Sequence, residues 1–460
     1  MYYQDTIAAI ATPIGSGSIG IIRISGPNAL GILTPIFRSV SFNPSCPVSH
    51  HLYYGSILDP EDGGLLDDVL VSYMKSPSSY TAEDIIEINC HSGLIILQKI
   101  LTIVVQAGAR LAEPGEFTKR AFLNGRIDLT RAEAVIDVID AKTEYGLKLA
   151  SRQLKGELAH RLYALQAELL EISSLVEASI DFPEEDITFL SSRELAARVK
   201  AAGDTIQNLA ATYDEGTLYR VGVQAVIVGK PNAGKSSILN ALLGDYRSIV
   251  TEIPGTTRDI IQETITLQGI PVKLIDTAGL RHSNNEIEKI GIDLMLSKIS
   301  EADIVLLILD GSSPLDVLDR TLLKKLENKN ILTVINKSDL PRVLSVDAVQ
   351  QELGPGAVVV TSSLMHEGIA ELKDTIAKMI LNDRHKSSSD ILLTNARHKT
   401  ALDTSWASLI HVHEGILNCF SPELLSVDLQ AVRSALGEIT GETTAEDILD
   451  SIFSNFCIGK

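Results

Sequence analysis

Apolar runs of strand length alternate with helical segments between residues 218 and 384, and this alternation limits the possible folds more than any other feature of the chain. The runs are VQAVIVG, VKLIDT, DIVLLILD, ILTVINK and AVVVTSS. Strands separated by helices pair mostly in parallel, with helices on both faces of the sheet. The sequence therefore predicts an α/β domain, whose ligands should bind at the carboxyl ends of its strands.

The first of these strands leads directly into GKPNAGKS, residues 229–236, which matches the phosphate-binding pattern G-x-x-x-x-G-K-S and opens a helical segment. In such a loop the backbone N–H groups and the helix N-terminus surround the phosphates. We expect Lys235 to act as a catalytic residue on the β- and γ-phosphates and Ser236 to bind Mg²⁺. The predicted nucleotide contacts in this loop are Asn232, Ala233, Gly234, Lys235, Ser236 and Ser237.

Two further motifs follow strands of the same predicted sheet. The first is DTAG, where a carboxylate can hold a Mg²⁺-bound water and a glycine N–H can contact the γ-phosphate. The second is NKSD, whose last carboxylate can accept hydrogen bonds from the ring N–H and amino group of guanine. Adenine would place an acceptor against that carboxylate, at a cost of about 1 to 3 kcal/mol. The motifs therefore predict GTP rather than ATP, through Asp276, Thr277, Ala278, Gly279, Asn336, Lys337 and Asp339.

The groups that catalyse hydrolysis are less evident. Many GTPases have a glutamine directly after the second motif to orient the attacking water, but this chain has Leu280 there. An apolar side chain cannot orient water, so a downstream carboxylate must do so, with Glu288 as the first candidate and Glu286 as the next.

Two sources of positive charge for the transition state remain open. Arg258 and Arg281 are candidate arginine fingers. Alternatively, the amide oxygen of Asn232 could hold a monovalent cation together with backbone carbonyls of TEIPGTT, residues 251–257. Thr257 would be the Mg²⁺ ligand of the switch loop.

The flanks of the α/β segment have a different character. Residues 1–118 contain β-branched runs and one helical run, GLIILQKILTIVVQAG, which predict a small α+β domain. Long helical periodicity begins near residue 119, and helical character returns after the polar stretch NDRHKSSSD. We therefore predict a discontinuous helical domain, residues 119–217 and 385–460, with the G domain, residues 218–384, inserted into it.

Composition excludes several classes of protein. No run approaches the roughly 20 apolar residues of a membrane-spanning helix, and the N-terminus lacks a signal-peptide pattern, so we expect a cytosolic protein without membrane contact. Four dispersed cysteines fit neither a zinc site nor a disulfide framework. A net charge of −19 means that any RNA contact needs a local basic patch or a partner.

The N-terminal stretch GSGSIG, residues 15–20, fits the dinucleotide pattern G-x-G-x-x-G. The segment that follows, IIRISG, is β-branched and predicts a strand, so no helix N-terminus would face a pyrophosphate. We interpret the stretch as a glycine-rich hairpin between two strands.

The C-terminal sequence CIGK has the outline of a lipidation box, but lysine is not a usual final residue and no polybasic run precedes it. Thr443 and Glu446 fit a capping box, after which Ile448, Leu449, Ile452, Phe453 and Phe456 share one helical face. We expect a docked helix. Cys457 is either a small buried residue or a reactive thiol.

The whole pattern resembles the tRNA modification GTPases of the MnmE (TrmE) family over essentially the full chain. The stretches that carry the resemblance are DTIAAIATPIGSGSIGIIRISG, PGEFTKRAFLNGRIDLTRAEAVIDVIDA, ASIDFPEED, GKPNAGKSSILNAL, PGTTRD, DTAGLR and FCIGK. The resemblance implies a homodimer whose N-terminal domain is similar to tetrahydrofolate-binding enzymes and binds a folate such as 5-formyltetrahydrofolate. It also implies a flavin-dependent partner, MnmG (GidA), and K⁺-activated GTP hydrolysis. Together the two proteins would install a carboxymethylaminomethyl or aminomethyl group at C5 of the wobble uridine of certain tRNAs.

The resemblance also assigns residues. The switch-loop contacts to the nucleotide would be Thr251, Glu252, Ile253, Pro254, Gly255, Thr256 and Thr257. The K⁺ ligands would be Asn232 and the backbone of Thr251, Ile253 and Thr256, and the Mg²⁺ ligands would be Ser236 and Thr257. Glu288 would orient the water. Ser362 and Ser363 stand where the family usually has Ser-Ala beside the guanine, a mild change because backbone N–H groups make most of that contact.

Arg23, Glu87, Arg126 and the terminal Lys460 match positions that contact folate in the family. From the residues alone, the first three would be interpreted as surface ion pairs. A second function, from a different class, is a regulatory GTPase switch that binds ribosomes or another assembly and does no chemistry of its own.

Overall fold

The computed structural model of the protein describes residues 5–13, 15, 17–181, 191–244, 262–276, 297–326, 329–353, 356–382 and 391–460. The chain divides into two compact units. The first contains residues 1–139, 150–206 and 400–460, and the second contains residues 140–149 and 207–399. The fold is multidomain α/β, as predicted.

A seven-stranded sheet forms the N-terminal part of the first unit, in the order β3-β4-β5-β6-β2-β1-β7. Neighbouring strands are antiparallel except β1 and β7. The strands are β1 (Ile7–Ile10), β2 (Ile19–Ser25), β3 (Phe37–Arg38), β4 (His51–Leu58), β5 (Leu65–Met74), β6 (Ile85–His91) and β7 (Arg110–Leu111). The helices of this part are α1 (Ala29–Ile36), α2 (Leu94–Gln106) and α3 (Glu116–Leu123).

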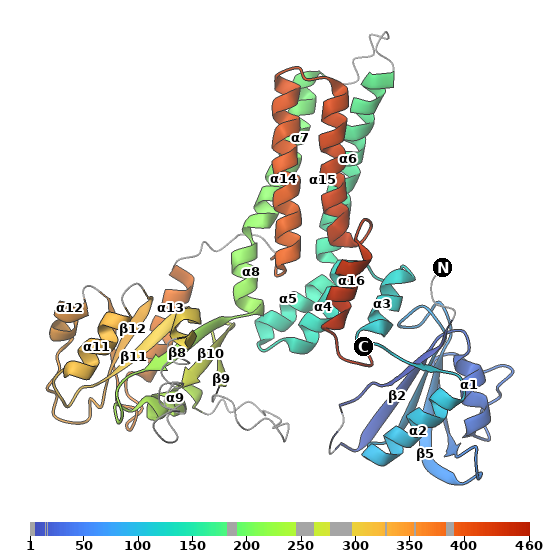
Figure 1. The fold of residues 1–460 in the computed structure, drawn as a ribbon, viewed down its shortest axis with the longest axis horizontal. Coiled ribbons are helices and arrows are strands. Elements are labelled where there is room, and N and C mark those ends of the chain that lie inside the picture. Colours follow the sequence, from blue (N-terminus) through green and yellow to red (C-terminus); the bar gives the residue numbers. More distant parts are fainter. Residues whose placement is uncertain are drawn as a thin grey trace. The chain divides into compact units, whose positions relative to one another are not determined.

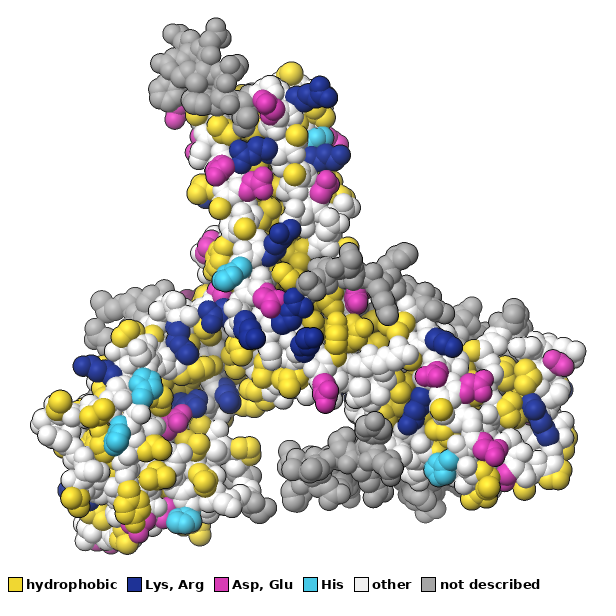
Figure 2. Space-filling model, turned by 180° about the vertical axis from the view of Figure 1, so that it is seen from behind, with side chains coloured by type: hydrophobic (Ala, Val, Ile, Leu, Met, Phe, Trp, Pro, Cys, Tyr) yellow, Lys and Arg dark blue, Asp and Glu magenta, His cyan; other side chains and the backbone are white. Residues whose placement is uncertain are grey.

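Period-2 alternation decides which face of this sheet is buried. In β2, Ile22 and Ile24 are fully buried and pack with Leu97 and Ile100 of α2. Figure 1 shows α1 and α2 on this face. On β4 and β5, the alternate residues Leu52, Tyr54 and Leu70 are exposed (57%, 66% and 44%). Figure 2, seen from behind, shows apolar side chains on the N-terminal part of the molecule.

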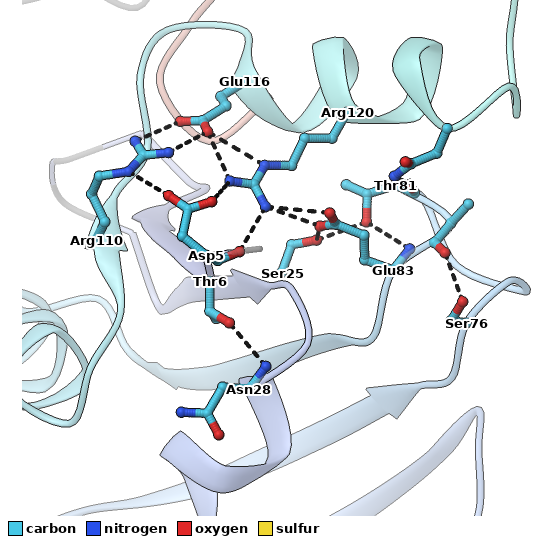
Figure 3. Close-up of polar contacts among 12 residues, drawn as sticks. Asp5, Thr6, Ser25, Asn28, Ser76, Thr81, Glu83, Arg110, Glu116 and Arg120 are labelled. Carbon is cyan, nitrogen blue, oxygen red and sulfur yellow. Dashed lines mark hydrogen bonds and ion pairs between the residues drawn. The ribbon is translucent and has the colours of Figure 1, made fainter. Parts of the chain in front are cut away.

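A network of charged groups around the buried Arg120 and Glu116 ties α3 to the sheet (Figure 3). Arg120, only 1% exposed, donates to Asp5 Oδ1 at 2.7 Å and to Glu116 Oε1 at 3.0 Å. Arg110 also bonds Asp5 and Glu116, and Arg120 Nη1 reaches Glu83 at 3.3 Å. Burial alone would raise the pKa of Glu116, but the hydrogen bonds from Arg110, the Glu113 amide and Arg120 outweigh it and lower that pKa.

Helices from both flanks of the chain pack together, which confirms a discontinuous helical arrangement. α6 packs along α15, Arg198 on α7 bonds Glu171 on α6 at 2.8 Å, and Ser405 on α14 donates to the Val432 carbonyl on α15. The helices are α4 (Leu129–Asp140), α5 (Glu144–Leu154), α6 (Glu157–Asp181), α7 (Ser192–Ala211), α8 (Tyr213–Arg220), α14 (Ala396–Leu417), α15 (Pro422–Thr440) and α16 (Glu446–Ser454).

The C-terminal helix docks as expected, but its predicted cap is wrong. Leu449, Phe453 and Phe456 pack against α3 and α4, whereas Ile448 is 37% exposed. The N-cap is Ala445 without a side-chain hydrogen bond. Thr443 does not cap the helix, because its hydroxyl donates to the Ser434 carbonyl at 2.8 Å.

The second unit contains a six-stranded sheet in the order β13-β12-β11-β8-β10-β9. All neighbours are parallel except β9 and β10. Its strands are β8 (Val223–Val228), β9 (Gln262–Leu267), β10 (Ile270–Asp276), β11 (Ile304–Asp310), β12 (Ile331–Asn336) and β13 (Ala357–Val360). The described helices that pack on the faces of this sheet are α9 (Lys235–Leu243), α11 (Val317–Lys325), α12 (Val346–Leu353) and α13 (Ile369–Asn382).

Alternate residues of β8 enter two different cores. Ala225 and Ile227 pack with α9 and α13, whereas Val226 and Val228 pack with α11 and α12. Helices therefore cover both faces, as the sequence predicted. The five apolar runs correspond to β8, β10, β11, β12 and β13, and the antiparallel edge strand β9 was not anticipated.

Candidate nucleotide site and a second polar cluster

The loop between β8 and α9 has a backbone that only certain residues adopt. Gly229 and Gly234 have φ values of 154° and 95°, and Asn232 has a φ of 65°. A Cβ at Gly229 would meet the Ile308 carbonyl, and one at Gly234 would meet the Asn336 side chain, so both positions require glycine. Lys235, 8% exposed, donates from Nζ to the Lys230 carbonyl at 2.9 Å. The loop thus encloses its lysine, in the manner expected of a phosphate site.

A hydroxyl and a carboxylate meet beside this loop. Ser236, in the first turn of α9, donates to Asp276 Oδ2 at 3.2 Å, and Asp276 ends β10 with 4% exposure. Mg²⁺ prefers such oxygen ligands and usually retains several waters. Ser236 and Asp276 therefore fit a site at which Mg²⁺ binds Ser236 directly and Asp276 directly or through water.

Asn336 connects the phosphate loop to the predicted guanine loops. Its Nδ2 donates to the Ala233 carbonyl at 3.1 Å, and its Oδ1 accepts from the Ser363 amide at 3.1 Å and the Thr361 hydroxyl at 3.3 Å. Asn336 is 1% exposed. Since the two loops share one buried amide, neither can move relative to the other without breaking a hydrogen bond.

Asp339, the candidate guanine acceptor, is positioned by the next loop. Ser362 donates from its hydroxyl to Asp339 Oδ1 at 2.6 Å. The structure therefore brings Asp339, Ser362 and Ser363 together at the carboxyl ends of β12 and β13. This is the sheet edge at which β8 ends in the phosphate loop.

Several predicted residues lie outside the described part of the chain. They are Thr251, Glu252, Ile253, Pro254, Gly255, Thr256, Thr257, Arg258, Thr277, Ala278, Gly279, Leu280, Arg281, Glu286 and Glu288. Their roles stay predictions.

Ion pairs beside the phosphate and guanine loops were missed from the sequence. Lys230 Nζ lies 3.0 Å from Asp319 and 3.2 Å from Asp316, and Lys337 Nζ lies 2.6 Å from Asp310. A signal for Asp310 was present, since it ends a strand of the same sheet, as Asp276 and Asn336 do. Nothing in the sequence marked Asp316 or Asp319.

In the first unit, Arg23 and Glu87 form an ion pair across neighbouring strands. They are register partners on β2 and β6, and Arg23 Nη2 lies 2.8 Å from Glu87 Oε1. The arginine also lies over the rings of Tyr80 and Phe117, 5.8 and 5.6 Å from their centroids. Arg126 donates to the Tyr80 carbonyl at 2.6 Å and lies over the same ring.

The C-terminal tail joins this polar cluster. Arg23 Nη1 donates to the Gly459 carbonyl at 3.0 Å, and the Phe117 amide donates to Lys460 O at 3.2 Å. Cys457 is exposed, which excludes the interpretation of Cys457 as a small buried residue. The structure therefore brings together Arg23, Glu87, Arg126 and the backbone of Lys460, residues that are far apart in the sequence.

The glycine-rich stretch near the N-terminus is not a dinucleotide site. Gly20 lies in β2, which pairs antiparallel with β1, and no helix follows the stretch directly. The hairpin interpretation is confirmed for the described residues.

Comparisons with known proteins cover the full length. The model of the MnmE helical domain matches residues 129–457, and that of the GTP-binding protein TrmE N-terminus matches residues 6–126. The tRNA modification GTPase MnmE of Geobacter sulfurreducens is 48% identical over 461 residues, covering 100% of both chains. The chain belongs to the MnmE family of tRNA modification GTPases. Its relative in Clostridioides difficile, of the same name, is 44% identical over 461 residues.

Membership of the MnmE family makes the chain a GTPase, and such enzymes use Mg²⁺ with the nucleotide. Among solved structures, the G domain of the T. maritima FeoB iron transporter is 32% identical, covering 34% of this chain and 98% of its own, with a TM-score of 0.28. Among the described helices of this family member, none is long and apolar enough to cross a membrane.

Proposed function

We propose that the protein hydrolyses GTP with K⁺ as activator and, together with the flavoprotein MnmG, adds a carboxymethylaminomethyl or aminomethyl group to C5 of the wobble uridine of certain tRNAs. A folate such as 5-formyltetrahydrofolate would bind in the N-terminal part. The observation that supports this most is the polar cluster in the first unit, because it combines a carboxylate, guanidinium groups and aromatic rings that suit a folate. Since the substrate is tRNA, we propose a cytoplasmic location.

The cluster has the chemistry that a folate needs. A pterin ring presents an amino group and a ring N–H, which a carboxylate such as Glu87 can accept as a pair. The carboxylates of a folate tail suit guanidinium groups such as Arg126, and Tyr80 and Phe117 offer aromatic faces beside Arg23. We place the folate against Arg23, Glu87 and Arg126, with Lys460 at its edge.

Isothermal titration of the intact protein with 5-formyltetrahydrofolate tests this placement. We expect saturable binding, which Glu87→Gln should weaken by at least about tenfold, because the amide cannot accept both N–H groups. Exposed Glu61→Gln is the control. Absence of binding to the intact protein would favour the regulatory switch. Normal wobble-uridine modification in cells lacking the protein would contradict the function as a whole.

For K⁺, the support is the geometry of Asn232. It is exposed on the phosphate loop with a φ of 65°, while the neighbouring Lys235 is buried. An amide oxygen there can coordinate a monovalent cation close to the phosphates, with the backbone of Thr251, Ile253 and Thr256 as further ligands. Ser236 and Thr257 would bind Mg²⁺, and Glu288 would orient the water.

GTP turnover measured in KCl and in NaCl tests the cation. We expect much faster turnover in KCl, and Asn232→Lys should remove the difference because its ammonium replaces the ion. Equal rates in both salts would leave an arginine finger, Arg258 or Arg281, as the better account. Full turnover in Glu288→Ala would exclude that carboxylate as the water-orienting group.

We also propose a homodimer formed through the N-terminal sheet. The face opposite α1 and α2 exposes Leu52, Tyr54 and Leu70, and Tyr54 and Leu70 are register partners on neighbouring strands. Exposed apolar side chains gathered on a sheet face mark a site of association. Light scattering should show a dimer, and Tyr54→Glu together with Leu70→Glu should convert it to monomers.

A further inference from the structure

The strand β11 ends on an aspartate that lies beside the guanine loop. Asp310 Oδ2 accepts a hydrogen bond from Lys337 Nζ at 2.6 Å. Its other oxygen, Oδ1, accepts from the amide and the hydroxyl of Ser312 at 2.9 and 2.6 Å. Because both oxygens are engaged, the carboxylate cannot rotate freely, and it restrains the ammonium of Lys337.

This carboxylate stays ionised in the folded protein. Burial alone would raise the pKa of Asp310, but the hydrogen bonds from Lys337 and Ser312 outweigh it and lower that pKa. Its side chain is 14% exposed and that of Lys337 is 30% exposed, so the pair is partly shielded from water. Charge-assisted hydrogen bonds of this kind are shorter and stronger than neutral ones.

Two more aspartates, at the start of α11, contact the phosphate loop. Lys230 Nζ lies 3.0 Å from Asp319 Oδ2 and 3.2 Å from Asp316 Oδ2. Asp319 is 2% exposed, and it also closes the capping box at the start of α11, where its amide donates to Asp316 Oδ1 at 3.0 Å. A carboxylate buried to this degree requires a counter-charge, and Lys230 supplies it.

Lys230 relays this restraint to the catalytic lysine. Its backbone carbonyl accepts the hydrogen bond from Lys235 Nζ at 2.9 Å. The side chain of Lys230 is therefore held by Asp319, while the Lys230 carbonyl orients the Lys235 ammonium that would contact the phosphates. The loop on which Lys230 lies cannot rotate without breaking one of these contacts.

We infer that Asp310, Asp316 and Asp319, which we call the β11–α11 aspartates, are positioning residues for GTP. Asp310 restrains Lys337 at the base, and Asp316 and Asp319 restrain Lys230, and through it Lys235, at the phosphates. They lie outside the three predicted GTP-binding motifs, GKPNAGKS, DTAG and NKSD. The inference rests on the proposed placement of GTP at this sheet edge.

Substitution of Asp310 and substitution of Asp319 should change nucleotide affinity in different ways. Lys337 faces the base side, which GTP and GDP share, so Asp310→Asn should raise the Kd of GDP and of a non-hydrolysable GTP analogue by the same factor, about fivefold. Lys235 contacts the γ-phosphate, so Asp319→Asn should weaken the GTP analogue at least about threefold more than GDP. Stopped-flow fluorescence with labelled nucleotides measures both.

A matched control is the ion pair between Glu352 on α12 and Arg320 on α11. Glu352→Gln removes the exposed pair with Arg320, whose atoms lie 2.9 Å apart, without touching either loop, and should leave both affinities unchanged. If Asp319→Asn does not fold, Lys230→Met removes the same pair from the loop side and should give the same pattern. Lys230→Arg keeps the charge and should restore affinity.

Three outcomes separate the possibilities. Affinities within twofold of wild type in both Asp310→Asn and Lys230→Met would overturn the inference. An equal loss of GTP analogue and GDP in Lys230→Met, not restored by Lys230→Arg, would also overturn it, since that is the result of a merely structural role. Wild-type GTP affinity in Lys235→Ala would show instead that the placement of GTP is wrong.

Discussion

Asn336→Ala is the sharpest test of how the nucleotide loops are held. The substitution removes the buried amide that joins the phosphate loop to the loop after β13. It leaves the Ala233 carbonyl and the Ser363 amide without their partner, while Ala233 is fully buried. In the free protein the loops can relax towards water, so we expect most of the cost to appear when the nucleotide fixes them again.

The magnitude follows from those two backbone groups. Each buried donor or acceptor that loses its partner costs about 1 to 3 kcal/mol. Taking about 2 to 4 kcal/mol for the pair, and about 1.4 kcal/mol for each factor of ten, GTP should bind about 30- to 700-fold more weakly. Titration of labelled GTP into the full-length protein measures this Kd directly.

Thr361→Val provides the matched control. It removes only the hydroxyl that donates to Asn336 Oδ1 at 3.3 Å, and it keeps the shape of a fully buried side chain. We expect a loss of less than about tenfold. A Kd for Asn336→Ala within threefold of wild type would refute the argument that this amide couples the two loops.

Two further predictions concern the first unit. The pKa of Glu116 is lowered on folding, so the stability that this carboxylate contributes is present above the unfolded value of about 4.3 and lost as the pH falls through the folded value. Glu116→Gln should therefore lower the free energy of unfolding at pH 7, and denaturant titrations should show a smaller decrease of that free energy between pH 5 and pH 3. A decrease equal to that of the wild-type protein would contradict this. Gly459 has a φ of 92°, and a Cβ there would lie 2.7 Å from the Ile10 carbonyl, so Gly459→Ala should displace the tail and weaken folate at least about tenfold. Ile458→Ala, at a 60% exposed position, should not weaken it, and equal affinities in the two variants would refute a role for the tail.

Local patterns predicted that the described phosphate-loop and guanine-motif residues gather at one sheet edge, and their contacts with GTP stay predictions. Strand alternation, the phosphate loop and the Asn336 and Asp339 motif each occupy a few consecutive residues, and the parallel sheet gathers their ends at one edge. The β11–α11 aspartates escaped notice because they contact lysines 27 to 89 positions away in sequence. Ion pairs over such distances depend on the packing of α11 and β12, not on local spacing.

The first unit shows the same limit. Arg23 and Glu87 are partners only because β2 pairs with β6 in one register, 64 positions apart. Family resemblance, and not local pattern, singled them out. The predicted cap at Thr443 failed for the opposite reason: a correct local motif lost to a tertiary contact, the Ser434 carbonyl.

Base specificity tests the central claim, a GTP site at the carboxyl edge of the second sheet, most directly. Asp339, oriented by the Ser362 hydroxyl at 2.6 Å, should accept both N–H groups of guanine, and Asp339→Asn should donate instead to the extra carbonyl of xanthine. In paired titrations, the wild-type protein should bind GTP more than about 100-fold more tightly than XTP, and the variant should prefer XTP. Unchanged preference for GTP in Asp339→Asn would contradict the account.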